Sequence, residues 1–265
     1  MKKIGIFDSG IGGLTLAHAL VKINPNISFC YYGDTAHLPY GDKTPELVRY
    51  YSHAIVDFLL NQGCDGILIA CNTASASAFD SLKATLPDGF PIFNVIDPIA
   101  EHIRSHYGKK DRIGVIGTRG TIASNIYQKR IRANNINAPE VFSKATPLLA
   151  PMIEEGFYDN SISLDLINNY INTPEFESLQ AIILGCTHYP LIKDQVSAIL
   201  GKNTAVIDSA HLVAAHICRV QEITSLSSEK DFFVSDLTDA FQLSAQHFFQ
   251  EMVPLEERDI WGHNT

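Results

Sequence analysis

Two stretches of the sequence recur in the same order in its second half. The segment Lys3–Gly10, KIGIFDSG, resembles the segment RIGVIGTR at 112–119, and an apolar run that ends at Cys71 resembles one that ends at Cys186. The first pair is offset by 109 residues and the second pair by 115 residues. Nearly equal offsets in the same order indicate two similar half-chains. Each half must then fold into the same kind of unit, and this constrains the fold more than any other feature.

Short apolar runs alternate along the chain with segments of helical period, and this alternation predicts parallel sheets covered by helices. We expect an α/β fold of two pseudo-symmetric parallel-sheet units with the active site in the cleft between them. The strand-like runs lie at 3–7, 27–32, 66–70, 91–95, 112–117, 140–143, 180–185 and 204–207, and helical segments lie at 47–60, 74–86, 100–107, 121–133 and 191–200.

A chain of 265 residues is long enough for two domains of ordinary size. The steps Asp97–Pro98 and Asp208–Ser209 each match the start of a helix after a strand-like run, so each suits a crossing between the units. The expected first domain covers residues 1–96 and 208–265, and the expected second domain covers residues 97–207. The tail is assigned to the first domain.

The composition excludes several classes of protein. A net charge of −9 with scattered Lys and Arg gives no electrostatic basis for binding nucleic acid. No run approaches the roughly 20 apolar residues that span a bilayer, and the start lacks the long apolar segment of a signal peptide. Five cysteines without a CxxC pair argue against a disulfide framework and a structural zinc site. We expect a cytoplasmic protein with free thiols, no metal, no membrane contact and no nucleic-acid partner.

Cys71 and Cys186 each stand where a buried strand would pass into a helix, in the runs GILIACNT at 66–73 and AIILGCTH at 181–188. Unpaired N–H groups at a helix start favour the thiolate form, which makes each thiol a usable base or nucleophile. The alternative is that both are small packing residues. The polar residues that follow each cysteine favour strand ends that line a crevice. Two thiols on opposite sides of one cleft suit a reaction that is symmetric about one atom.

The loop DSGIGG at 8–13 follows the first strand-like run and opens a helix. Thr15 stands where a dinucleotide-binding fingerprint requires a third glycine, so the cofactor interpretation is weak. The loop still offers backbone N–H groups, the Ser9 hydroxyl and the Asp8 carboxylate, which together could hold a small zwitterion and orient a thiol. A plain capping turn is the alternative.

Two further features concern supporting groups. His188, two residues after Cys186, can protonate or stabilise that thiol. Glu154 and Glu155 stand at an expected helix end, where a charged terminus and a catalytic support role are the alternatives. The turn-rich segment 33–41 follows a strand, where α/β proteins place ligand-binding loops.

Four motifs together resemble the signature set of bacterial glutamate racemases. They are FDSGIGG at 7–13, GDTA to PYG at 33–41, ACNTA at 70–74 and LGCTHYPL at 184–191. The match runs in order and covers most of the chain. The resemblance implies a cofactor-independent racemase, an isomerase that interconverts L- and D-glutamate and supplies D-glutamate for peptidoglycan synthesis in the cell wall.

The resemblance also implies roles for individual residues. Cys71 would act on the Cα of the D isomer and Cys186 on that of the L isomer, each serving as acid when the other serves as base. Asp8 and His188 would support the two thiols, with Glu154 or its neighbour Glu155 assisting. The implied substrate-binding residues are Asp8, Ser9, Tyr40, Gly41, Asn72, Thr73, Thr118, Thr121, Thr187 and His188. The chain departs from the family pattern at His37, where many relatives carry Arg, and from Glu155–Gly156 onward.

The chemistry of racemisation agrees with a pair of thiols. The Cα proton of an amino acid is a very weak acid, so its removal must be nearly concerted with delivery from the opposite face in a site shielded from water. Three alternatives remain: an aspartate racemase of the same two-cysteine group, a hydrolase with one nucleophilic thiol, and a non-catalytic binding protein. His188 favours glutamate over aspartate, and the pairing of the cysteines argues against the other two. The expected partner is the small-molecule substrate, and a homodimer is left open.

Overall fold

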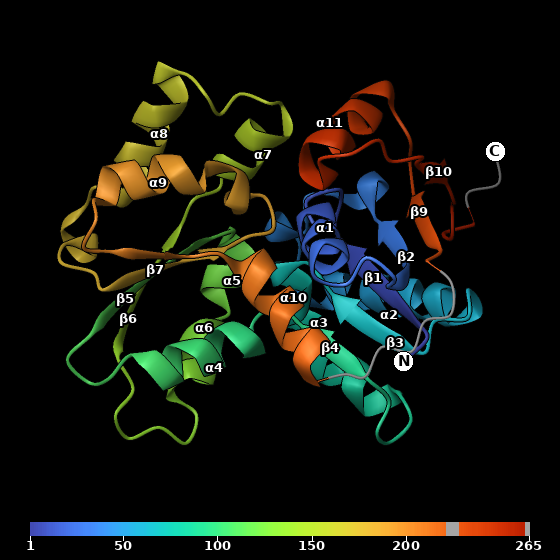
Figure 1. Ribbon diagram of the computed structural model, residues 1–265, viewed down its shortest axis with the longest axis horizontal. Coiled ribbons are helices and arrows are strands. Elements are labelled where there is room, and N and C mark those ends of the chain that lie inside the picture. The colour runs from blue at the N-terminus through green and yellow to red at the C-terminus, as the bar shows by residue number, and fades with distance from the viewer. Residues whose placement is uncertain (221–227, 263–265) are drawn as a thin grey trace.

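A computed structural model describes residues 1–220 and 228–262 of the chain. The described residues form two β-sheets in separate halves of the molecule, each covered by helices, with the helix Ser209–Val220 (α10) between the halves (Figure 1). Every strand pair in both sheets is parallel. The prediction of two parallel-sheet α/β units is therefore confirmed.

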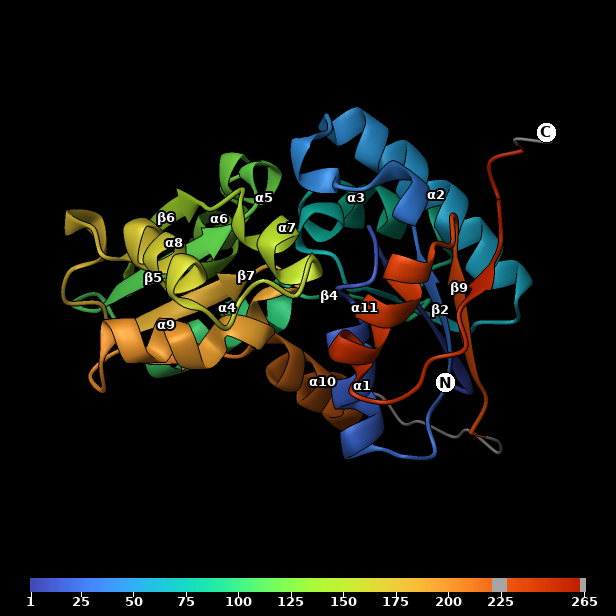
Figure 2. The same ribbon diagram turned by 90° about the horizontal axis from the view of Figure 1, so that it is seen from above.

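The first sheet, sheet A, has six strands in the order β10-β9-β2-β1-β3-β4. Helices α2 and α3 pack near one face, and α1 packs against α10 and α11 near the other (Figure 2). The strands are β1 (Lys3–Asp8), β2 (Ser28–Gly33), β3 (Gly66–Ile69), β4 (Ile92–Asn94), β9 (Lys230–Val234) and β10 (Glu256–Glu257), and the helices are α1 (Leu14–Ile23), α2 (Pro45–Asn61), α3 (Asn72–Thr85) and α11 (Asp239–Phe249).

The second sheet, sheet B, has four strands in the order β6-β5-β7-β8. In Figure 1, α8 and α9 lie above this sheet and α4 and α6 below it. The strands are β5 (Arg112–Gly117), β6 (Glu140–Ala145), β7 (Ala181–Gly185) and β8 (Ala205–Ile207), and the helices are α4 (Asp97–His106), α5 (Arg119–Ala123), α6 (Ile126–Arg132), α7 (Leu149–Glu154), α8 (Ser161–Ile171) and α9 (Lys193–Leu200).

The two sheets share one connectivity, which explains the internal repeat. The order β2-β1-β3-β4 in sheet A is the order β6-β5-β7-β8 in sheet B. The repeated glycines, Gly5 and Gly114, lie in the corresponding strands β1 and β5. A Cβ at Gly5 would lie 2.9 Å from Ile67 Cδ1, and a Cβ at Gly114 would lie 2.6 Å from Leu179 Cδ1. Each glycine is therefore required by close packing over the middle of its strand.

Helices begin at the two steps where crossings between the halves are expected: α4 begins at Asp97 and α10 begins at Ser209. Helix α4 packs against α6, whereas α10 packs against α1 and also touches α4. The domain boundaries themselves stay a prediction, and the segments 221–227 and 263–265 of the expected first domain lie outside the described residues.

Several local expectations were wrong. The segment 121–133 is not one helix: α5 ends at Ala123 and α6 begins at Ile126, with Asn125 between them in the left-handed conformation at φ 53°. Asparagine tolerates this conformation better than most residues, so it permits the break. Helix α8 and the short strand β10 were not expected.

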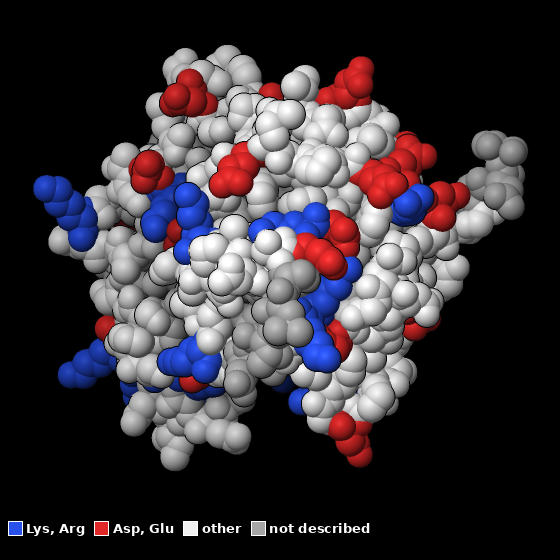
Figure 3. Space-filling model, turned by 45° about the vertical axis from the view of Figure 1, so that its right-hand side comes forward, with Lys and Arg blue, Asp and Glu red and all other residues white. Residues whose placement is uncertain are grey.

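The described surface carries both signs of charge. On the face seen in Figure 3, Lys and Arg side chains lie among Asp and Glu side chains. Within residues 1–220 and 228–262, no helix is long and apolar enough to cross a membrane.

Candidate active site

The two cysteines line one cavity at the carboxyl ends of the parallel strands. This cavity has a volume of about 180 Å³. Cys71 lies two residues after β3 of sheet A, and Cys186 directly follows β7 of sheet B. Ligands of α/β proteins commonly bind at this end of a sheet. The lining residues are Ser9, Leu38, Pro39, Tyr40, Gly41, Cys71, Asn72, Thr73, Thr118, Ala150, Pro151, Glu154, Cys186, Thr187 and His188.

Cys71 caps the first turn of α3 and is buried, with 5% of its surface exposed. Its Sγ accepts a hydrogen bond from the backbone N–H of Ala74 at 3.4 Å, and the thiol donates to Ser9 Oγ at 3.7 Å. Burial, together with the nearby Asp8 carboxylate, raises the pKa of Cys71 to about 12, against the lowering effect of the Ala74 N–H and Ser9. The helix start therefore favours the thiolate form of Cys71 as expected, but burial and Asp8 outweigh it and favour the protonated thiol.

Cys186 is linked to a carboxylate through His188. His188 Nδ1 lies 3.5 Å from Cys186 Sγ, and His188 Nε2 lies 2.7 Å from Glu154 Oε1. Burial lowers the pKa of His188, but Cys186 and Glu154 outweigh burial and hold the pKa well above its usual value. His188 is then an imidazolium at neutral pH, with one N–H directed at the sulfur and the other at the carboxylate. The imidazolium can give a proton to a Cys186 thiolate, and the neutral imidazole that remains can take it back.

Glu154 and Glu155, which the sequence left as alternatives, have different surroundings. Glu154 ends α7, lines the cavity and contacts His188, whereas Glu155 lies one residue beyond the helix and is exposed. The contact with His188 therefore comes from Glu154.

Asp8 lies behind the cavity wall, fully buried at the end of β1. One carboxylate oxygen, Oδ2, accepts a hydrogen bond from the Gly13 N–H at 2.9 Å. The other, Oδ1, finds no hydrogen-bond partner among the described residues. Burial raises the pKa of Asp8, and the nearby His188 cation counteracts part of this effect. An ionised Asp8 is therefore costly to the fold, which is typical of groups kept for function.

We expect Asp8→Asn to stabilise the fold while reducing activity. Because the pKa of Asp8 is raised in the folded state, wild-type stability falls as pH rises above the ordinary carboxyl pKa and levels off above the folded pKa. Asparagine keeps an oxygen for the Gly13 N–H and has no charge to bury. Thermal melts should show a gain on the order of 1 kcal/mol at pH 7.5 and a smaller gain near pH 4. A lower melting temperature at pH 7.5 would contradict this account.

Hydroxyl groups from both halves meet across the cavity. Thr118 Oγ1 lies 2.9 Å from Thr73 Oγ1 and 3.0 Å from Thr121 Oγ1, so this network joins α3 to α5. Thr121 is buried and does not line the cavity, so it reaches the cavity through Thr118. Asn72 lines the wall while its amide donates to Tyr127 Oη at 2.8 Å.

The segment 33–41 contributes another part of the wall. Tyr40 and Gly41 line the cavity, but the Tyr40 hydroxyl donates to Asp34 Oδ2 at 2.6 Å. The Tyr40 hydroxyl is thus engaged by Asp34, which leaves the ring and backbone of Tyr40 for contact with a ligand. Asp34, which was not among the expected site residues, is fully buried and also accepts from Ser235 Oγ at 2.8 Å. These hydrogen bonds to Asp34 hold the segment 33–41 in place.

The expected loop residues Ser9 and Thr187 also line the cavity, and Thr187 Oγ1 lies 3.3 Å from His188 Nδ1. The wall residues that sequence reasoning missed are Leu38, Pro39, Ala150 and Pro151. Pro39 adjoins the expected Tyr40, and Pro151 lies three residues before Glu154, so proximity in sequence was the available signal.

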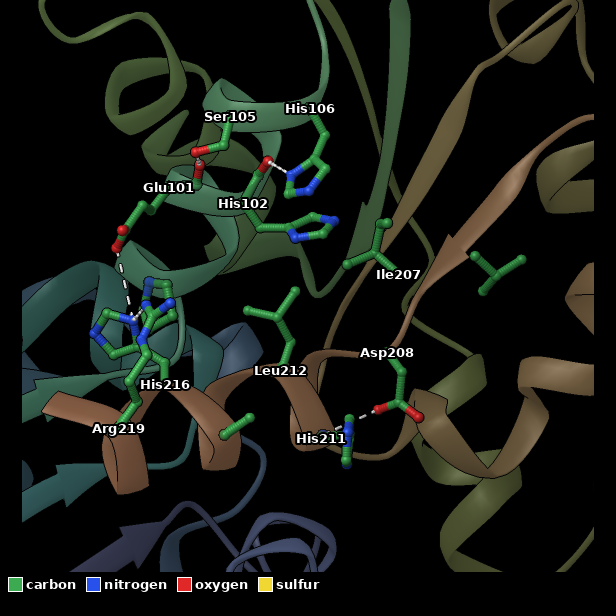
Figure 4. Close-up of a pocket in the computed structure, with 13 residues that line it drawn as sticks. Glu101, His102, Ser105, His106, Ile207, Asp208, His211, Leu212, His216 and Arg219 are labelled. Atoms are coloured by element: carbon green, nitrogen blue, oxygen red, sulfur yellow. Dashed lines mark hydrogen bonds and ion pairs between the residues drawn. The ribbon is translucent and has the colours of Figure 1, made fainter. Parts of the chain in front are cut away.

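A larger cavity of about 490 Å³ lies between α4 and α10 and contains neither Cys71 nor Cys186 (Figure 4). His102 and His106 line it from α4, and their rings stack with centroids 4.2 Å apart. His211 and His216 line it from α10. Across the described part of the chain, no group of His, Cys, Asp and Glu side chains is arranged to hold a metal ion. The smaller cavity is the candidate active site because both thiols line it.

Comparison with known proteins gives one consistent family. Residues 18–217 match the family model of Asp/Glu/hydantoin racemases. A glutamate racemase from Geobacter metallireducens is 40% identical over 246 residues, which cover 91% of this chain and 90% of that protein.

Solved structures agree with this match. A glutamate racemase isoform from Bacillus anthracis superimposes with a TM-score of 0.90 at 31% identity, covering 97% of both chains. A glutamate racemase from Francisella tularensis, solved in complex with D-glutamate, superimposes with a TM-score of 0.88 at 33% identity and covers 99% of both chains.

Proposed function

Because this chain belongs to the Asp/Glu/hydantoin racemase family, we propose that its paired thiols interconvert L- and D-glutamate. The single observation that carries the mechanism is the cavity lined by Cys71 from one half and Cys186 from the other. The reaction supplies D-glutamate for peptidoglycan synthesis and needs no cofactor, as the family resemblance implies.

The proposed reaction passes one proton to the substrate as another leaves it. Inversion at Cα requires removal on one face and delivery on the opposite face, and a thiol from each half can serve one face. Cys71 acts on the D isomer and Cys186 on the L isomer. A Cα carbanion without an electron sink is too unstable to persist, so the two transfers are nearly concerted. The enclosed cavity holds the reacting atoms close and limits access of water.

The two thiols begin with different partners in this mechanism. Cys71 starts as a thiol, because burial and Asp8 raise its pKa to about 12, and so it is ready to donate. Cys186 has the imidazolium of His188 at 3.5 Å, with which it can exchange a proton. In the direction from L-glutamate, Cys186 removes the Cα proton and Cys71 delivers one to the opposite face. In the reverse direction, Cys71 must act as a thiolate. Its own neighbours are neutral or negative, so we expect the α-ammonium group of the bound substrate to stabilise that thiolate.

The substrate is held by neutral donors on the cavity wall, with Asp8 behind them. Glutamate carries an α-ammonium group, and Asp8 Oδ1, which lacks a partner among the described residues, places negative charge near it; direct contact requires the wall to rearrange, since Asp8 is fully buried and does not line the cavity. The carboxylates are met by hydroxyl, amide and backbone N–H groups. These donors are Ser9, Gly41, Asn72, Thr73, Thr118 and Thr187, with Tyr40 and Thr121 supporting them.

Circular dichroism of the purified protein with L-glutamate and no added cofactor tests the proposed function. The signal should decay to zero, because enantiomers have equal free energy and the equilibrium mixture is racemic. Dialysis against a chelator should leave the rate unchanged. Activity that disappears on dialysis, or that follows a visible absorbance, would refute the cofactor-independent mechanism.

We expect a preference for glutamate over aspartate of at least 10-fold in kcat/KM, since one missing methylene commonly changes this ratio by about 10- to 200-fold. The same dichroism assay with L-aspartate measures it. Equal kcat/KM values would assign the chain to the aspartate group instead, the alternative against which His188 argues.

Location and assembly are part of the proposal. All five cysteines are unpaired, which suits the reducing conditions of the cytoplasm.

A homodimer is supported by exposed apolar side chains beside the contact of α7 with α11, namely Leu148, Phe157 and Leu243. Light scattering after size exclusion gives the mass that decides between monomer and dimer.

A further inference from the structure

The thiol cavity offers little positive charge to its substrate. None of the described residues that line it is Lys or Arg. Its one cation, His188, already faces Glu154 and Cys186. Glutamate has two carboxylates and one ammonium group, so it arrives with a net charge of −1, and the protein has a net charge of −9. Attraction of the substrate must therefore come from positive charge outside the cavity.

A second cavity beside the first carries that charge. It has a volume of about 460 Å³ and shares Gly41 and Thr73 with the thiol cavity. It lies where α5 of one half faces α2 and α3 of the other (Figure 2). Lys43, Arg49 and Arg119 line it together with Asp42. Arg49 is paired with Glu46 at 2.6 Å and Arg119 with Asp42 at 3.0 Å, so the cations outnumber these carboxylates by one. We call it the outer cavity.

The contact of residues 40–42 with α5, here called the seam, separates the outer cavity from the thiol cavity, which is the cavity lined by Cys71 and Cys186. Arg119 Nη1 lies 3.0 Å from Asp42 Oδ1, with side chains 60% and 54% exposed. Gly41 and Gly120 pack closely behind this pair, since a Cβ at Gly120 would lie 3.2 Å from the Gly41 carbonyl oxygen. Passage from the outer cavity therefore requires the residues 40–42 to move away from α5, and this movement separates Asp42 from Arg119. Exposed ion pairs of this kind contribute little stability, so the separation is easy.

The apolar part of the wall of the thiol cavity is less suitable for an anion. Leu38, Pro39, Ala150 and Pro151 form that part of the wall, and Glu154 lies next to them. The apolar groups offer no hydrogen bonds to a carboxylate, and Glu154, which is already paired with His188, offers no donor either. The charge distribution thus favours approach from the side of Arg119.

We propose that the Asp42–Arg119 pair is the gate through which glutamate enters the thiol cavity, with Arg119 exchanging the Asp42 carboxylate for a carboxylate of the substrate. The inference rests on the proposed function, because it concerns the same substrate and the same cavity. Arg119 acts in entry and binding only. It is exposed at the seam and does not line the thiol cavity.

Steady-state kinetics of charge variants at this pair test the gate. Arg119→Gln should lower kcat/KM for glutamate about tenfold in both directions and change kcat less than twofold, since electrostatic attraction changes capture rather than chemistry. Arg119→Lys should keep most of kcat/KM because it keeps the charge. Asp42→Asn frees Arg119 and should raise kcat/KM at low ionic strength. Added salt should lower kcat/KM of the wild type and have less effect on Arg119→Gln.

Arg130→Gln is the matched control. Arg130 on α6 also forms ion pairs, to Asp80 on α3 and Asp97 on α4, but it lines neither cavity. It should leave kcat/KM within twofold. Equal losses in Arg130→Gln and Arg119→Gln, or an unchanged kcat/KM in Arg119→Gln, would overturn the gate, as would a lower kcat/KM in Asp42→Asn. A wild-type protein that does not racemise glutamate would instead refute the proposed function, so the two failures are distinguishable.

Discussion

Replacing either Cys71 or Cys186 by serine abolishes racemisation, and this is the largest effect that we expect from any single substitution. A serine hydroxyl is too weak an acid to exchange a proton with Cα at neutral pH, and the surviving thiol reaches only one face. Inversion requires both faces, so one thiol cannot replace the other. Each variant should retain less than about 0.1% of the wild-type kcat, since loss of one of two groups that act as a unit removes most of the catalysis.

Cys218→Ser is the matched control for these variants. Cys218 is a free thiol on α10, half-buried and outside the cavity, so its loss should leave kcat within twofold. Racemisation in deuterated water adds a second measurement: the wild type should place solvent deuterium at Cα of the inverted product, because the delivering thiol exchanges with solvent before turnover. If either cysteine variant kept more than a few per cent of wild-type racemisation, with contaminating host enzyme excluded, the two-base mechanism would be wrong.

The arrangement of the two sheets was predictable because the signals were local and repeated. The run that ends at Cys71 and the run that ends at Cys186 are apolar and short, which is typical of buried parallel strands. Each is the third strand of its unit, β3 or β7, and pairs with the first strand, β1 or β5. The repeat in the sequence therefore indicated that the two sheets would have the same strand connectivity. The helix break at Asn125 was not predictable from periodicity, because the apolar period continues across it.

The chemical state of Cys71 was harder to predict than its position. The helix-start N–H of Ala74 does lower the pKa of this thiol, as its place in the sequence suggested. Burial and the charge of Asp8 act in the opposite direction and raise the pKa to about 12. Burial depends on packing between the halves, which no local pattern reveals. The sequence therefore predicts where the thiol stands and not which proton state it rests in.

The apolar wall of the cavity carried no chemical signal. Leu38 and Ala150 line the cavity beside the reactive groups, yet each looks like an ordinary packing residue in the sequence. The choice between Glu154 and Glu155 was open for a similar reason, since both stand at the same helix end. Only the contact of Glu154 Oε1 with His188 distinguishes them.

The second large effect that we expect comes from a substitution at Gly12, whose Cα lies against Thr187 and His188 of the other half. A Cβ at Gly12 would lie 2.4 Å from His188 Cε1 and 2.5 Å from Thr187 Oγ1. Neither group can move freely, because His188 is held by Glu154 at 2.7 Å and by Cys186 at 3.5 Å. Gly12→Ala must therefore displace the imidazole from the thiol that it supports, or separate the two halves at the cavity. Misplacement of a catalytic group by about 1 Å commonly costs about 100-fold in rate.

We expect Gly12→Ala to fold and to lose about 100-fold in kcat/KM, equally in both directions because the equilibrium constant between enantiomers is one. Gly10→Ala in the same loop is the matched control: a Cβ there would lie 3.5 Å from Leu38 Cδ2, an ordinary contact distance, so activity should stay within a few-fold of wild type. Circular dichroism in the far ultraviolet verifies folding, and initial rates from each enantiomer give the two directions. Wild-type activity in Gly12→Ala would mean that the halves separate without cost, and that the position of His188 in the closed site is not required for turnover.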